Sequence, residues 1–146
     1  MGNELAYRPL VAVLVGGQVP VVAPLARDEQ GVVCNVNADD VAAGIAAGLG
    51  ARQLILLTDV DGVRDADGRR LDTLTVGEAE ALIASGVIAG GMVPKVRAAL
   101  GALAWDEAEA VIADSSAPEA LERALADPAF GTRITARRPA GAGVAS

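Results

Sequence analysis

The stretch Gln53-Leu-Ile-Leu-Leu-Thr58 decides the predicted fold of this 146-residue chain. A short, continuous apolar run of this kind is typical of a parallel β-strand that is covered on both faces. We therefore expect the strand to lie at the centre of a sheet. The stretch that follows, Asp59-Val-Asp-Gly-Val63, is rich in Asp and Gly and predicts a loop at the carboxyl end of that strand.

Downstream of this strand, helix signals alternate with further strands. Thr75 and Glu78 form a T-x-x-E capping box, which predicts a helix that begins there and ends at Gly86. Residues 109–114, with the apolar run Ala110-Val-Ile-Ala113, predict another strand. Similar signals predict a helix with Pro94 in its first turn, a helix that begins with a second capping box at Ser116 and Glu119, and a last edge strand at residues 131–135.

Upstream of the strand, the chain reads as a helix, a hairpin and a second helix. Residues 8–17 predict a short helix, and residues 19–25 predict a buried strand whose prolines favour an edge or a strand end. The turn residues 28–31 and the β-branched residues 32–36 complete a hairpin. Asn37 is expected to cap the following helix, which Gly50 closes.

The order of these elements predicts an α/β fold with a mostly parallel sheet between helices. This three-layer sandwich would carry one antiparallel hairpin near its start. We assign residues 1–18 to a short N-terminal helical segment and residues 19–135 to the main domain. Residues 136–146 are expected to form a disordered tail.

Composition excludes several classes of function. The formal net charge of −7 has the wrong sign for tracking a phosphate backbone, so no nucleic acid is expected as a partner. Histidine is absent, which removes His-based catalytic triads and His-ligated metal sites. Cys34 is the single cysteine and fits a reducing cytoplasm. The apolar run at residues 10–15 is too short to span a membrane, and no signal peptide is recognised, so we expect a cytoplasmic protein without membrane contact.

Three segments, residues 35–39, 58–63 and 90–95, are the candidates for a ligand site, because ligands of such sheets bind at the carboxyl ends of strands. We expect all three to share one edge of the sheet. Asn35 and Asn37 are two residues apart and can offer amide groups to one small polar ligand. Asp39, in the first turn of a helix, would be held ionised by the helix dipole. A capped helix start without any ligand explains these residues as well.

Lys95 is the only lysine in the chain and stands against eleven arginines. It follows Gly90-Gly91 at the opening of a predicted helix, where backbone N–H groups and the helix dipole favour an anion such as phosphate. Thr58, Asp59 and Gly62 can form a nucleotide site after the central strand. A solvated surface cation and ordinary turn chemistry are the alternatives.

Other nucleotide and metal motifs are not present. The aspartates of residues 59–70 do not have the spacing of a calcium-binding loop, so no protein-held metal is predicted. Neither G-x-x-x-x-G-K-[ST] nor G-x-G-x-x-G occurs in the chain, which leaves Walker-type and Rossmann sites unsupported.

Five motifs in one order resemble the C-terminal half of acetylglutamate kinase, of the amino-acid kinase superfamily. They are Pro20-Val-Val-Ala-Pro24, Asn35-Val-Asn-Ala-Asp39, Leu56-Leu-Thr-Asp-Val-Asp-Gly-Val63, Gly90-Gly-Met-Val-Pro-Lys95 and Gly131-Thr-Arg-Ile134. The resemblance implies that Asn35 and Asn37 bind the acylated amino-acid substrate and that Asp39 and Lys95 are catalytic. It also implies an ATP site lined by Thr58, Asp59, Gly62, Val63, Gly91 and Met92.

The resemblance implies phosphoryl transfer from ATP to the side-chain carboxylate of N-acetylglutamate, a step of arginine biosynthesis. It also implies Mg²⁺ as a cofactor, held mainly by the phosphates. Family enzymes are about twice as long, and their lysine-bearing glycine-rich strand has no counterpart in residues 1–18. We therefore expect an incomplete catalyst that pairs with a separate N-terminal half or forms a homo-oligomer. The alternatives are a catalytically silent interaction module with an exposed apolar patch, and an unrelated acidic α/β domain.

Overall fold

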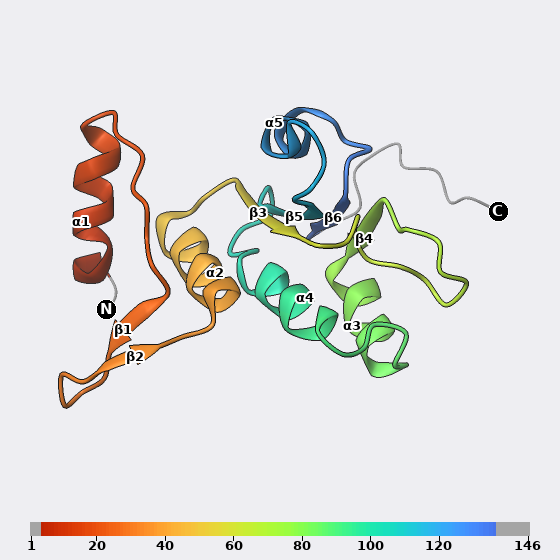
Figure 1. The fold of residues 1–146 in the computed structure, drawn as a ribbon, viewed down its shortest axis with the longest axis horizontal. Helices are drawn as coiled ribbons and strands as arrows, with labels where there is room; N and C mark the ends of the chain where they lie inside the picture. Colours follow the sequence, from red (N-terminus) through yellow and green to blue (C-terminus); the bar gives the residue numbers. More distant parts are fainter. Residues whose placement is uncertain (1–3, 137–146) are drawn as a thin grey trace.

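The main sheet has four strands in the order β3-β5-β6-β4, as the computed structural model of residues 4–136 shows (Figure 1). β3 (Gln53–Thr58) pairs in parallel with β5 (Glu109–Asp114) over its whole length. β5 pairs antiparallel with β6 (Thr132–Thr135), which in turn pairs in parallel with β4 (Thr73–Thr75). The predicted α/β class with a mostly parallel sheet is confirmed.

The positions of two strands differ from the prediction. β3 lies at an edge of the four-stranded sheet and not at its centre, although its sequence is that of a covered strand. β6 was expected at an edge but lies between β5 and β4. Ile134 and Thr132 of β6 are completely buried, because the strand has a neighbour on each side. β4 was not predicted, since three residues inside a polar loop carry too little pattern.

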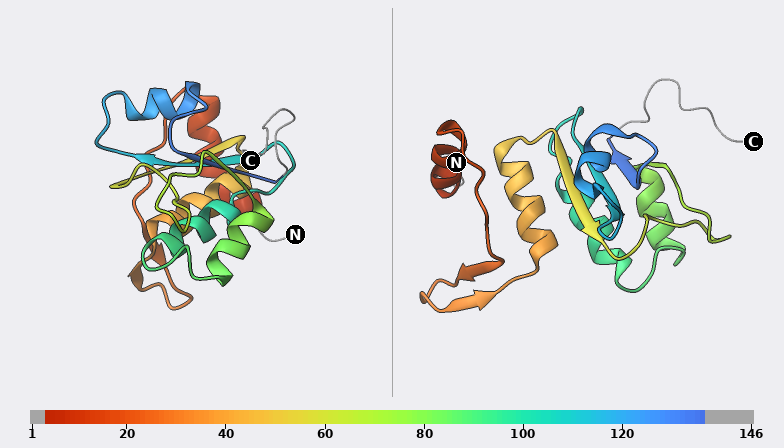
Figure 2. Two further views of the ribbon diagram at one scale, coloured as in Figure 1. Left: turned by 90° about the vertical axis from the view of Figure 1, so that its right-hand side faces the viewer. Right: turned by 45° about the horizontal axis from the view of Figure 1, so that its top comes forward.

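Helices cover both faces of this sheet and form the three expected layers (Figure 2). α2 (Ala38–Leu49), α3 (Val76–Ala84) and α4 (Met92–Gly101) pack against one face, where Leu54 and Ile112 point into the larger core cluster. α5 (Ala120–Ala126) covers the other face, where its residues Ala120 and Ala124 share a second core cluster with Val111 of β5 and with Phe130.

Of the three predicted N-terminal caps, two are confirmed and one is wrong, and Pro94 lies in the first turn of α4 as expected. Asn37 caps α2, and the capping box of Thr75 and Glu78 opens α3. The expected box of Ser116 and Glu119 does not form, because the Asp114 carboxylate accepts hydrogen bonds from both the backbone N–H and the hydroxyl of Ser116. The Ser116 hydroxyl is therefore engaged with Asp114, and α5 begins at Ala120 without a side-chain cap.

The N-terminal part of the described chain lies beside α2. α1 (Glu4–Val15) begins earlier than the predicted helix of residues 8–17, with Pro9 inside it. The Tyr7 hydroxyl donates a hydrogen bond to the Gly44 carbonyl oxygen at 3.1 Å, and its ring lies so close to Gly48 that a Cβ there would collide with it. Two glycines one turn apart therefore let α1 approach the backbone of α2.

The predicted hairpin is confirmed, but the buried strand before it is wrong. β1 (Leu25–Arg27) pairs antiparallel with β2 (Val33–Asn35) in a two-stranded sheet of its own. Residues 19–24 form no strand, and Val21 is 97% exposed. Two prolines in this segment cannot donate ladder hydrogen bonds, and no described strand runs beside it.

The predicted tail of residues 136–146 lies outside the described residues except for Ala136. Among the helices described, none is long and apolar enough to cross a bilayer.

Candidate functional site

Lys95 and Asp39, which are 56 residues apart in the sequence, form an ion pair. The Lys95 Nζ atom lies 3.0 Å from the Asp39 Oδ2 atom, and about a quarter of each side chain is exposed, 25% and 23%. Asp39 lies in the first turn of α2 and Lys95 in the first half of α4. The two side chains that the sequence singles out therefore meet where these helices pack.

The three candidate segments do not share one sheet edge, which corrects the sequence interpretation. Asn35 ends β2, and β2 belongs to the separate hairpin sheet. The Asn37 Oδ1 atom accepts hydrogen bonds from the backbone N–H groups of Asp39 and Asp40, at 2.8 and 3.2 Å. The side-chain amide oxygen of Asn37 is thus used as a helix cap, and it positions the Asp39 backbone.

The β3–β4 loop (residues 59–72) carries the candidate nucleotide residues. Thr58 is buried, and its hydroxyl lies 3.1 Å from the Asp59 carboxylate, whose residue is exposed. Gly62 and Val63 are buried where the loop turns back. The loop pairs with itself through a hydrogen bond of 2.8 Å from the Leu71 N–H to the Val63 carbonyl oxygen.

A cavity of about 270 Å³ lies between this loop and the start of α4. Of the predicted nucleotide residues, Gly62, Val63 and Met92 line it, whereas Thr58, Asp59 and Gly91 do not. The full lining consists of Val60, Gly62, Val63, Arg64, Asp65, Val87, Ile88, Ala89 and Met92. The wall is mainly aliphatic, with Arg64 and Asp65 as its charged members, which suits a flat apolar ring with polar edges.

The start of α4 connects this cavity with the ion pair. Gly91 is the N-cap of α4, and the first turn of the helix carries no acidic side chain. The N–H groups of Met92 and Val93 donate to the Ala89 and Gly90 carbonyl oxygens, both at 3.3 Å, so these two groups are not free as the sequence led us to expect. Met92 lines the cavity and Lys95 is three residues further along the helix, on the same side. The positive end of the helix dipole and the lysine therefore lie next to each other, which favours an anion.

Two residues near this region were missed by the sequence interpretation. Asp114 ends β5 directly opposite Thr58 in the sheet register. Hydrogen bonds from the hydroxyl and then the backbone N–H of Ser116 lower the pKa of the Asp114 carboxyl from its usual value. The rule that ligands bind at strand ends would have found Asp114, because it is the last residue of a predicted strand. Thr132 stands in the motif Gly131-Thr-Arg-Ile134, but nothing in that motif predicts that its hydroxyl is buried and bonded to the β3–β4 loop.

Among residues 4–136 no group of three or more His, Cys, Asp or Glu side chains gathers that could hold a metal ion. A divalent cation at this site would therefore take most of its oxygen ligands from a bound ligand and from water.

The sheet and its two helical layers define a three-layer α/β domain with a cavity at the start of α4. Residues 4–114 match the Amino acid kinase family model, and the chain belongs to this family. It is 48% identical over 118 residues to an acetylglutamate kinase of Solibacter usitatus, which covers 81% of the chain and 46% of that protein. With an acetylglutamate kinase of Acidiphilium cryptum, the identity is 42% over 135 residues, 92% of this chain and 45% of the relative.

Solved structures show the same fold. An N-acetylglutamate synthase of Neisseria gonorrhoeae, solved with coenzyme A and L-arginine, superposes with a TM-score of 0.79 at 26% identity, covering 92% of this chain and 31% of that one. A carbamate kinase of Giardia lamblia bound to AMP-PNP gives a TM-score of 0.66 at 27% identity, with 88% and 44% covered. The chain thus spans about half the length of the curated relatives it matches.

Proposed function

We propose that this chain is the nucleotide-binding, C-terminal half of an acetylglutamate kinase. In this proposal it takes part in phosphoryl transfer from ATP to the side-chain carboxylate of N-acetylglutamate, a cytoplasmic step of arginine biosynthesis. The observation that carries the proposal is the Lys95–Asp39 ion pair near the start of α4. Similarity to acetylglutamate kinases supports the choice of acceptor.

The residues present suit this chemistry. A carboxylate acceptor is already a nucleophile, so the reaction needs no general base, and the lack of histidine is no obstacle. The transferred phosphoryl group needs positive charge, which the Lys95 ammonium and the positive end of the α4 dipole can supply. Asp39 would hold the lysine in place, and the cavity lined by Gly62, Val63 and Met92 would hold the base of the nucleotide.

Magnesium would be bound mainly by the nucleotide. It would neutralise charge on the phosphates, as in other phosphoryl transfers. Asp59 and Thr58 lie at the end of β3 and could hydrogen-bond to its water ligands or to the phosphates. Asn35 and the amide nitrogen of Asn37 are left as the proposed contacts to the acylated amino acid.

We further propose that catalysis needs a complementary N-terminal half. β3 has no partner on its outer edge among the described strands, and Leu57 of this strand is 40% exposed. The apolar side chains Val11, Leu14, Val19 and Val21 are also exposed. A silent interaction module would expose such a patch too, but membership of a kinase family and the ion pair favour the kinase over that alternative.

Calorimetric titration of the chain with MgATP tests the nucleotide part of the proposal. We expect binding heat with the wild type and at least tenfold weaker binding for Lys95→Ala, because a charged hydrogen bond to phosphate contributes about 1.5–3 kcal/mol. Arg97→Ala is the matched control, since Arg97 is an exposed cation on the same helix. Equal binding by wild type, Lys95→Ala and Asp59→Ala would contradict the proposal.

The acceptor is tested by adding the N-terminal half of a related acetylglutamate kinase. Acyl-phosphate formation, trapped as the hydroxamate, should require both halves, MgATP and N-acetylglutamate. Product formation with carbamate but not with N-acetylglutamate would contradict the assigned acceptor and leave the nucleotide site unaffected.

A further inference from the structure

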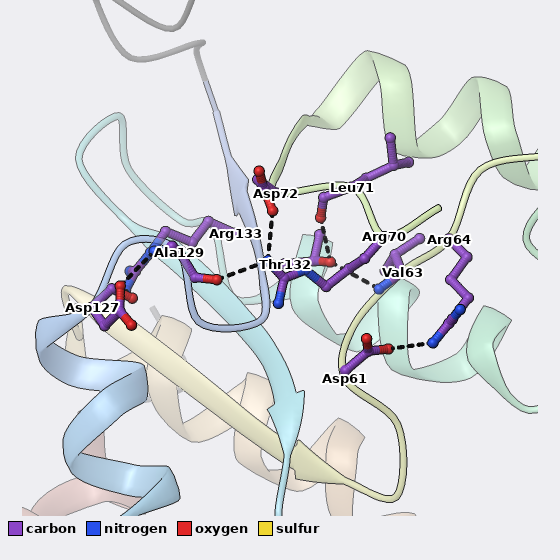
Figure 3. Close-up of polar contacts among 10 residues, drawn as sticks. All are labelled: Asp61, Val63, Arg64, Arg70, Leu71, Asp72, Asp127, Ala129, Thr132 and Arg133. Atoms are coloured by element: carbon purple, nitrogen blue, oxygen red, sulfur yellow. Dashed lines mark hydrogen bonds and ion pairs between the residues drawn. The ribbon is translucent and has the colours of Figure 1, made fainter. Parts of the chain in front are cut away.

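Thr132 carries a hydroxyl that is completely buried and that joins the two arms of the β3–β4 loop (Figure 3). Its Oγ1 atom accepts a hydrogen bond of 2.8 Å from the Val63 N–H and donates one of 2.6 Å to the Leu71 carbonyl oxygen. One side chain on β6 therefore holds the outgoing and the returning arm of a loop about 60 residues earlier in the chain.

Gly62 is shaped to this hydroxyl. A Cβ at residue 62 would collide with the Thr132 Oγ1 atom, and it would lie 3.2 Å from the Arg70 side chain. The φ angle of Gly62 is +145°, a backbone conformation that side-chain-bearing residues rarely adopt. The loop thus passes over the hydroxyl at a distance that only glycine allows.

Further contacts fix the same base of the loop. The Arg133 N–H donates to the Asp72 carbonyl oxygen at 2.9 Å. Arg70 Nη2 donates to the Ala129 carbonyl oxygen at 2.8 Å and to the Asp72 carboxylate at 2.7 Å. The two Arg70 contacts lie at the surface. The Thr132 hydroxyl, in contrast, is inaccessible to water, so solvent cannot replace its hydrogen bonds.

The arm that Thr132 holds forms one wall of the cavity beside α4. Val63 is 1% exposed, and residues 62–65 line the cavity together with Ile88 and Met92. Thr132 itself does not line the cavity. Any effect of its hydroxyl on a ligand must therefore act through the position of the Gly62–Val63 backbone.

We propose that Thr132 is a positioning residue for nucleotide binding, whose buried hydroxyl sets the wall that residues 62–65 present to the nucleotide. The inference rests on the proposed function, because it assumes a nucleotide in this cavity. It adds that the C-terminal strand β6, which touches no part of the cavity, controls its shape.

The test compares Thr132→Val, which keeps the shape and removes the hydroxyl, with Thr132→Ser, which keeps the hydroxyl. We expect MgATP to bind Thr132→Ser within about twofold of the wild type and Thr132→Val about tenfold more weakly. Ile134→Val is the matched control, because it removes one buried methylene from the same strand and no hydrogen bond to the loop, and its affinity should be unchanged.

Hydrogen exchange of the Val63 amide gives a readout that needs no ligand. The amide should be protected in the wild type and in Thr132→Ser and should exchange much faster in Thr132→Val. Should Thr132→Val fail to fold, Thr132→Ala replaces it, because it also removes the hydroxyl and leaves Gly62, which lines the cavity, unchanged.

The outcomes separate the two proposals. Wild-type binding that Thr132→Val leaves unchanged, or that Ile134→Val weakens equally, overturns the positioning role alone. Equal weakening by Thr132→Ser and Thr132→Val overturns it too, because the hydroxyl is then not the group that matters. Absence of MgATP binding by the wild type overturns the proposed function and with it the inference.

Discussion

Neutralising the Lys95–Asp39 pair should separate its structural from its functional contribution. At a charge separation of about 4 Å and an effective dielectric constant of about 20, the pair attracts by about 4 kcal/mol before desolvation. Fully exposed pairs contribute about 0.2–1 kcal/mol and broken buried pairs cost about 3–5 kcal/mol. With a quarter of each side chain exposed, this pair lies between these limits.

We expect Lys95→Met to lower the free energy of unfolding by about 1.5 kcal/mol. The cost stays near the lower limit, because Asp39 keeps some water contact and lies at the positive end of α2, which stabilises its charge without the lysine. At about 2.1 cal/mol/K per residue, the unfolding entropy of a chain of this length is about 0.3 kcal/mol/K. The Tm should therefore fall by about 5 °C.

Chemical denaturation of Lys95→Met, Asp39→Asn and the double variant measures the pair directly. The double-mutant cycle should give a coupling of about 1 kcal/mol. Turnover with the complementary half should fall far more, by about a hundredfold, and Lys95→Arg should not restore it, because the planar guanidinium differs from the ammonium in reach and hydration. Additive single effects, or wild-type turnover by Lys95→Arg, would refute this reasoning.

Three further changes test other parts of the structure. Gly48→Val should push the Tyr7 ring away from α2 and loosen the packing of α1, which would be detected as faster proteolysis of α1. Gly77→Ala, at a helix position with open space around it, should leave the rate of proteolysis unchanged. Ile134→Ala should cost about 3 kcal/mol in chemical denaturation, because the residue is completely buried between two strands. The lowered pKa of Asp114 means that its stabilising contribution is present above the unfolded-state pKa and lost as pH falls through the folded-state pKa. Asp114→Asn should therefore be less stable than the wild type at neutral pH, and the difference should shrink in acid denaturation curves.

Elements with strong local signals could be predicted from the sequence. α2 is bounded by Asn37 and by Gly50, whose φ angle is +63°, and both act within one turn of the helix ends. The capping box of α3 is equally local, with the Thr75 N–H bonded to the Glu78 carboxylate at 2.8 Å. Such signals need no knowledge of the rest of the chain, which is why they were predicted correctly.

Strand order could not be predicted in this way, because it depends on partners far away in the sequence. The apolar run of β3 indicates cover on both faces, and it has that cover from α2 and α5. It says nothing about how many strands lie beside it. β6 shows the converse: its four residues look like an edge strand, yet its neighbours are β5 and β4. The residues of a strand indicate whether its two faces are covered, whereas its position at the edge or the centre of a sheet depends on the other strands.

The ion pair was anticipated from the right residues but for the wrong structural reason. The sequence interpretation placed Asp39 and Lys95 at one rim of a single sheet, whereas β2 is not part of that sheet. What brings the two charges together is helix packing: small side chains of α2 and α4, among them Ala43 and Ala99, share the larger core cluster. Because alanine keeps the helix axes close, the stem of Lys95 is long enough to reach the first turn of α2. The alanine-rich composition of these helices therefore positions the candidate catalytic pair, and larger residues at these positions should separate the two charges before they unfold the domain.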